Sequence, residues 1–102
     1  MPPQWLKVAT LEQVPPGKPY TFEWQGWPLA IHNVAGQIYC VGNMCPHQGR
    51  PLDGGAIEGT HLTCPWHAWV FDLKTGLSPY TSSARIPCFP TRLEGTDILV
   101  GL

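Results

Sequence analysis

The chain has 102 residues, which suffices for one compact domain and leaves no room for a second. Six Lys and Arg balance seven Asp and Glu, and a net charge of −1 gives no basic surface for nucleic acid or an anionic membrane. No apolar run is long enough to span a bilayer and the N-terminal residues do not resemble an export signal, so we expect a cytoplasmic protein.

Short segments rich in aromatic and β-branched residues follow one another along the chain, separated by twelve prolines and eleven glycines. This pattern predicts an all-β fold with many turns and no helix. The predicted strands are Trp5–Ala9, Tyr20–Trp24, Leu29–Asn33, Ile38–Val41, His61–Cys64, Trp69–Leu73, Thr91–Leu93 and Ile98–Val100. We expect residues 78–90 to form an ordered loop, and Trp5, Trp24 and Trp27 to fill the core.

Two short groups of Cys and His lie between these strands. Cys45 and His47 are separated by one residue, sixteen residues follow, and Cys64 and His67 are separated by two. Thiolate and imidazole together favour a soft or borderline metal, and an intracellular protein has little use for a disulfide. Spacing alone leaves two candidates open: a structural zinc with two Cys and two His, or a two-iron, two-sulfur cluster with both thiolates on one iron.

The residues around these ligands distinguish the two candidates. CPHQG, a Gly-rich connection and CPWHAWVFDLKTG, within residues 43–76, resemble the Rieske iron-sulfur family. The resemblance implies a single domain over residues 1–102, with a small cluster-binding subdomain of two loops at about 43–76 on an antiparallel β base. It also implies that one [2Fe-2S] cluster is held by Cys45 and Cys64 on one iron and by His47 and His67 on the other. Gly49, Gly54 and Gly55 serve either close packing of backbone near the cluster or simple turn formation.

Four positions differ from the high-potential members of this family. Where those proteins link the two cluster loops by a disulfide, this chain has Arg50 and Trp66. Where they donate hydroxyl hydrogen bonds to the cluster, it has Trp69 and Phe71. Because hydrogen bonds to sulfur stabilise the reduced state, their loss predicts a potential near the bottom of the Rieske range, roughly −150 mV.

A low potential suits a carrier that accepts electrons from a reduced flavin. The chain looks like the ferredoxin component of multicomponent aromatic-ring oxygenases, which is not itself an enzyme. The resemblance implies transient contacts with a flavoprotein NAD(P)H reductase and a terminal oxygenase, and a monomeric carrier. The small Rieske-like subunit of an assimilatory nitrite reductase is the alternative. Arg50, Asp53 and Arg85 are candidate charges at the rim of the contact surface. Trp66 and Trp69, which flank His67, either shield the cluster from water or form an apolar contact surface for a partner.

The remaining cysteines and histidines have no ligand spacing. We expect Cys40 and Cys88 to be small buried apolar residues without a disulfide between them. We expect His32 and His61 to be surface or hydrogen-bonded structural residues.

Overall fold

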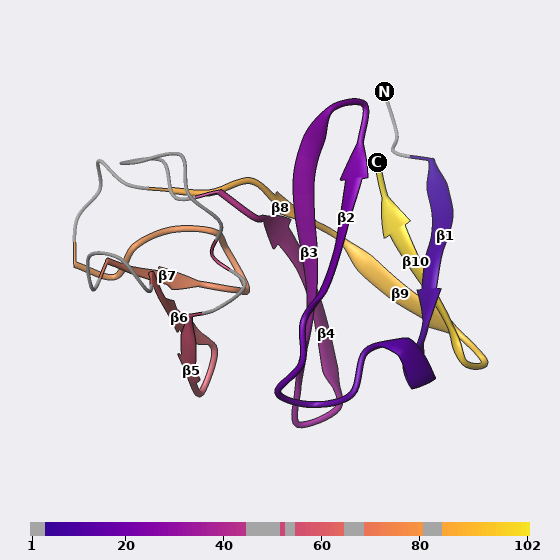
Figure 1. The fold of residues 1–102 in the computed structure, drawn as a ribbon, viewed down its shortest axis with the longest axis horizontal. Coiled ribbons are helices and arrows are strands. Elements are labelled where there is room, and N and C mark those ends of the chain that lie inside the picture. The colour runs from indigo at the N-terminus through magenta and orange to yellow at the C-terminus, as the bar shows by residue number, and fades with distance from the viewer. Residues whose placement is uncertain (1–3, 45–51, 53–54, 65–68, 81–84) are drawn as a thin grey trace.

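The computed structural model describes residues 4–44, 52, 55–64, 69–80 and 85–102. These residues form three antiparallel sheets, joined by turns and one short 3-10 turn at Leu11–Gln13. Figure 1 shows two sheets side by side and a small third sheet set apart from them. The all-β prediction is confirmed.

The first sheet joins the two ends of the described chain. Strand β1 (Trp5–Thr10) pairs with β10 (Asp97–Gly101), which in turn pairs with β9 (Thr91–Glu94). β9 and β10 are connected by Gly95 and Thr96 alone, since Glu94 faces Asp97 across the turn. At one edge of this sheet, the side chain of Lys7 lies 3.3 Å from a carboxylate oxygen of Asp97, on the surface.

The second sheet has the order β2, β3, β4, β8, and we call these first two sheets the base. It consists of β2 (Tyr20–Trp24), β3 (Trp27–Val34), β4 (Gln37–Gly42) and β8 (Cys88–Phe89). Two-residue turns, Gln25–Gly26 and Ala35–Gly36, connect β2 to β3 and β3 to β4. All four turn residues have positive φ, the conformation that lets so short a turn follow the twist of the strands.

The third sheet, called the small sheet below, carries the segments next to the predicted ligands. Its strands β5 (Ala56–Glu58), β6 (His61–Thr63) and β7 (Val70–Asp72) are three residues long each. β6 is central, with Leu62 paired to Ile57 on one side and to Phe71 on the other. β6 ends directly before Cys64, and β7 begins directly after Trp69.

Two short strands fall where the sequence did not predict them. β5 was missed because three residues after a Gly pair give too little alternation to indicate a strand. β8 lies inside the predicted loop 78–90, between Pro87 and Pro90, and exists because Cys88 and Phe89 pair with β4. The predicted loop is therefore wrong at its C-terminal end. The 3-10 turn at Leu11–Gln13 was also not expected.

The described side chains pack into two hydrophobic cores. The base core lies between the two base sheets and comprises Ala9, Val14, Leu29, Ile31, Cys40, Ile98 and Val100. The loop-side core lies next to the small sheet and comprises Val41, Leu52, Leu62, Cys64, Phe71, Leu73 and Ile86. Neighbouring residues of β4 enter different cores, Cys40 the first and Val41 the second, because successive strand residues face opposite sides. β4 therefore connects the two halves of the molecule.

The tryptophan prediction is largely wrong. Trp24 is half-buried and packs against the base core, as expected. Trp27 is 62% exposed, and Trp5 lies on the surface with the Arg92 guanidinium 5.0 Å from its ring. Aliphatic residues of β3 and β10 fill the base core instead, since their alternating positions face inward from both sheets.

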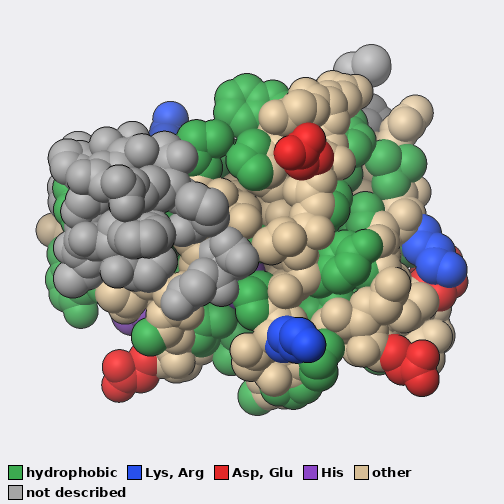
Figure 2. All heavy atoms as spheres, viewed as in Figure 1, with side chains coloured by type: hydrophobic (Ala, Val, Ile, Leu, Met, Phe, Trp, Pro, Cys, Tyr) green, Lys and Arg blue, Asp and Glu red, His purple; other side chains and the backbone are tan. Residues whose placement is uncertain are grey.

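The chain carries few charged residues, and on the face shown in Figure 2 they do not gather by sign. Figure 2 shows Lys, Arg, Asp and Glu side chains scattered over one face of the molecule between apolar and uncharged groups. No helix in the described part of the chain is long and apolar enough to cross a membrane.

Candidate metal centre

Only one of the four predicted ligands lies in the described part of the chain. Cys64 follows β6 directly and is 2% exposed, within the loop-side core. Cys45, His47 and His67 lie outside the described residues, as do Arg50, Asp53 and Trp66. The ends of the two segments that carry the predicted ligands, called the ligand-bearing segments below, are described, however, and these ends constrain the candidate site.

The second segment is closed at its base by a backbone hydrogen bond. The N–H of Cys64 donates to the carbonyl of Trp69 over 2.6 Å, and His67 lies within the six residues that this bond spans. The strands on either side, β6 and β7, pair through Thr63 and Val70. The chain therefore leaves the small sheet at Cys64 and returns to it at Trp69 with fixed ends.

Gly55 brings the end of the first segment against the start of the second. A Cβ atom at Gly55 would collide with the backbone carbonyl of Thr63, the residue before Cys64. Only glycine permits this close approach, so close packing requires glycine at this position, which also donates its backbone N–H to the carbonyl of Leu52 three residues earlier. The two segments that carry the predicted ligands thus begin or end side by side on the small sheet.

The surroundings of Cys64 are apolar. Phe71 is fully buried in the same core, and half-buried Trp69 packs against that core. Neither side chain carries a hydroxyl group. Desolvation and the absence of hydroxyl donors at these two positions agree with a cluster whose reduced state receives little stabilisation.

Cys40 and Cys88 stand apart from the predicted ligands. Cys40 is fully buried in the base core, as expected, whereas Cys88 is exposed, contrary to the prediction, because β8 is a two-residue strand at the edge of its sheet. No disulfide joins them. Burial, and to a smaller extent the nearby Cys88, raises the pKa of Cys40 from 9.0 to about 12. Partial burial and the charge of Asp72 raise the pKa of Cys88 as well. Both thiols are therefore neutral at physiological pH and poor metal ligands.

The two other histidines differ in exposure. His32, on β3, is 2% exposed, which contradicts a surface position. His61 is half-exposed at the start of β6, with its Nε2 atom 4.0 Å from a carboxylate oxygen of Asp72. These placements are structural, since β3 and β6 each hold their histidine within a sheet.

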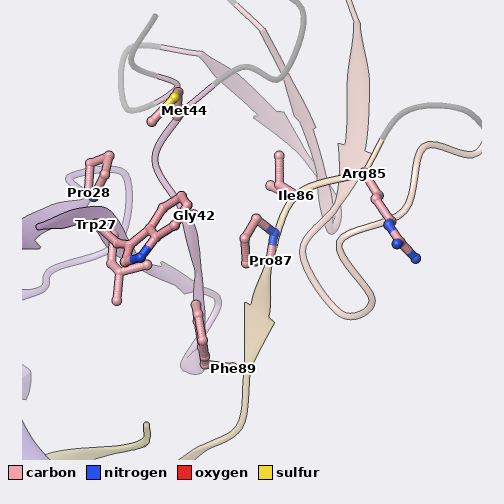
Figure 3. Close-up of a pocket in the computed structure, with 9 residues that line it drawn as sticks. Trp27, Pro28, Gly42, Met44, Arg85, Ile86, Pro87 and Phe89 are labelled. Atoms are coloured by element: carbon pink, nitrogen blue, oxygen red, sulfur yellow. The ribbon is translucent and has the colours of Figure 1, made fainter. Parts of the chain in front are cut away.

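A groove between the base and the loop-side segment was not foreseen from the sequence. It has a volume of about 240 Å³ and is lined by Trp27, Pro28, Leu29, Gly42, Met44, Arg85, Ile86, Pro87 and Phe89. In Figure 3, Trp27 and Pro28 lie across from Ile86 and Pro87, while Arg85 points away. Met44, which is 37% exposed, directly precedes Cys45. No sequence pattern predicts this groove, and Trp27, which we expected in the core, lines it instead.

The residues present fit a [2Fe-2S] cluster of the Rieske kind. Two thiols and two imidazoles match its ligand set, and Cys64, the one predicted ligand in the described part of the chain, lies in a buried, apolar position. Cys64 also follows Thr63, whose carbonyl packs against Gly55 near the end of the first ligand-bearing segment.

Comparisons with known proteins identify the family. The family model described as Rieske [2Fe-2S] domain matches residues 4–90. The ferredoxin component of a naphthalene 1,2-dioxygenase system from Pseudomonas aeruginosa is 30% identical, over 100% of this chain and 99% of that protein.

Two solved structures share the fold. The ferredoxin of carbazole 1,9a-dioxygenase from Nocardioides aromaticivorans IC177 has a TM-score of 0.85 and 29% identity, over 95% of this chain and 96% of that chain. A chain in a complex of reduced oxygenase and oxidized ferredoxin in carbazole 1,9a-dioxygenase has a TM-score of 0.80 and 28% identity, over 95% and 92%. The family match therefore favours a [2Fe-2S] cluster over the zinc site that the ligand spacing left open. The chain belongs to the Rieske [2Fe-2S] domain family as an electron-transfer component with one [2Fe-2S] cluster, not as a catalytic subunit.

Proposed function

We propose that this protein carries single electrons to the terminal oxygenase of an aromatic-ring dioxygenase system. The observation that supports this most directly is the full-length likeness to a ferredoxin component of a naphthalene 1,2-dioxygenase system. A complex between oxygenase and ferredoxin is named among the structures that share the fold. The comparisons do not favour the nitrite reductase alternative.

The proposed ligands are Cys45 and Cys64 on one iron and His47 and His67 on the other. The cluster, when bound, accepts and releases one electron. The chain supplies the ligands, removes water from the thiolate side and sets the potential. Burial of Cys64 in the loop-side core supports its assignment as a thiolate ligand.

We further propose a flavoprotein NAD(P)H reductase as the electron donor and a cytoplasmic location. The carrier acts as a monomer, as one domain over residues 1–102 whose cluster-binding part is about 43–76. The small sheet and the described ends of both segments that carry the proposed ligands lie within that range, which is consistent with this division. Contacts with each partner are small and transient, because a carrier must dissociate after each transfer.

The test is direct transfer between purified proteins. The protein is reduced with dithionite and mixed in a stopped-flow instrument with an oxidised terminal oxygenase of an aromatic-ring dioxygenase system. We expect fast reoxidation that saturates with oxygenase concentration. A nitrite reductase large subunit serves as the matched acceptor. Faster transfer to the nitrite reductase would overturn the proposal.

Voltammetry tests the proposed low potential. Trp69→Ser with Phe71→Tyr restores the two hydroxyl groups, and we expect the midpoint to rise because new donors to sulfur favour the reduced state. Trp69→Leu with Phe71→Leu changes the same positions without a hydroxyl and serves as the control. A wild-type midpoint well above zero, or an unmoved midpoint in the hydroxyl variant, contradicts the proposal.

A further inference from the structure

Asn43 lies where the base ends and the first ligand-bearing segment begins. It follows β4 directly, and its backbone N–H donates to the carbonyl of Pro28 on β3 over 2.9 Å. The residue is only 9% exposed, and the one other buried polar residue in the described part of the chain is His32. The backbone of Asn43 is therefore fixed to the base sheet.

The side chain of Asn43 reaches across the first segment. Its Oδ1 atom accepts a hydrogen bond from the backbone N–H of Leu52 over 3.0 Å, in a buried position. Leu52 is fully buried in the loop-side core. The residues between these two include Cys45 and His47, so one side-chain hydrogen bond joins the two ends of the segment that carries two of the proposed ligands.

A second hydrogen bond and a packing contact connect Leu52 to the second ligand-bearing segment. The carbonyl of Leu52 accepts a hydrogen bond of 2.9 Å from Gly55, which packs against Thr63, the residue before Cys64. A displacement of Leu52 would therefore be transmitted to the position of Cys64. In the same way, the Cys64 N–H bond to Trp69 closes the second segment.

We propose that Asn43 is a positioning residue for the cluster, which ties the ends of the first ligand-bearing segment so that its two ligands meet those of the second. The inference rests on the proposed ligand set. Removing the acceptor leaves the buried N–H of Leu52 without its partner and frees the segment at one end. Groups that hydrogen-bond to metal ligands directly change metal affinity by about 10- to 100-fold when removed, and Asn43, which acts through the backbone of Leu52, should act at the lower end of that range.

The test compares three variants of the cluster-loaded protein. Asn43→Ala removes the acceptor, and Asn43→Asp keeps an oxygen that can accept from Leu52. Asn33→Ala is the matched control, because the Asn33 amide also joins two backbone segments, donating to Val14 over 2.9 Å and accepting from Gly36 over 3.0 Å, but within the base. The readouts are the rate at which an iron chelator bleaches the visible absorbance and the g values of the dithionite-reduced protein.

We expect the alanine variant at position 43 to lose its cluster about 10-fold faster or more, with shifted g values, and the aspartate variant to stay close to wild type. Asn33→Ala should lower the unfolding midpoint without changing either readout. Equal losses in Asn43→Ala and Asn43→Asp, or in Asn43→Ala and Asn33→Ala, would overturn the proposal. A wild-type protein without a Rieske-type spectrum would overturn the ligand assignment instead, which keeps the two failures distinguishable.

Discussion

The base and the loop-side region, which is the small sheet with the segments that share the loop-side core, reach a folded state by different means. In the base, strands of up to eight residues are joined by two-residue turns, and inward-facing aliphatic side chains build the core. In the loop-side region, three strands of three residues share a core with Leu52, Leu73 and Ile86, which come from separate segments. Strands this short form few hydrogen bonds with each other, so side-chain and loop contacts must supply the rest of the stabilisation. We expect the base to fold without the cluster and the loop-side region to depend on it.

The largest expected effect comes from removing one large side chain from each core. Phe71→Ala in the loop-side core should lower the free energy of unfolding by about 3–5 kcal/mol, and Leu29→Ala in the base core by about 2–5 kcal/mol. Only the first should also speed cluster loss under native conditions, because Phe71 shares its core with Cys64. Chemical denaturation and chelator bleaching measure the two effects. Equal bleaching rates in both variants would show that the two regions are not independent.

The second test compares two glycines. Gly55→Ala should destabilise by about 1–3 kcal/mol, because its methyl group meets the Thr63 carbonyl. Gly36→Ala should cost about 1–2 kcal/mol for a different reason, since its φ of +90° is unfavourable for alanine although the space around it is open. Iron content after purification should fall in the first variant alone. Full iron content in Gly55→Ala would contradict the proposed contact between the two segments.

A third test uses the buried thiol of the base. The folded pKa of Cys40 is about 12 against an ordinary value of 9.0, so the folded protein holds this proton more tightly than the unfolded chain. The stabilisation is complete below pH 9.0 and is lost as the pH rises toward 12. Urea unfolding between pH ~8 and pH ~11 should therefore show a steeper decline for wild type than for Cys40→Ala. Parallel declines would mean that this thiol does not contribute.

The smallest expected effect is that of Trp27, at the groove between the regions. Trp27 is 62% exposed, so Trp27→Ala should change the free energy of unfolding by no more than about 0.5 kcal/mol. Trp24→Ala, on the preceding strand, removes a side chain that packs against the base core and should cost distinctly more. Thermal unfolding of the two variants checks this difference. A large loss in Trp27→Ala would mean that the groove is part of the core.

Much of the fold follows from local chemistry, and the sequence predicted it well. Apart from β8, the strands of the base were placed to within two residues, because alternation and turn residues such as Ala35–Gly36 act within a few positions. The family, and with it the cofactor, could be identified because the predicted ligands lie in short motifs of consecutive residues. The ligand roles of Cys45, His47, Cys64 and His67 stay predictions.

Other features depend on residues far apart in the sequence. β8 forms only because β4 offers an edge, and Cys88 is exposed because that strand is the outermost of its sheet. Trp27 is exposed because aliphatic side chains from β3 and β10 already fill the base core.

The sequence by itself determined the fold class, the turns of the base and the family to which the chain belongs, since each rests on neighbouring residues. Only the tertiary structure revealed that Asn43 bonds to Leu52 and that Gly55 makes room for Thr63. Both contacts join segments that are brought together by the fold and not by neighbouring positions in the sequence. No local pattern distinguishes an asparagine or glycine with such a role from one in an ordinary turn.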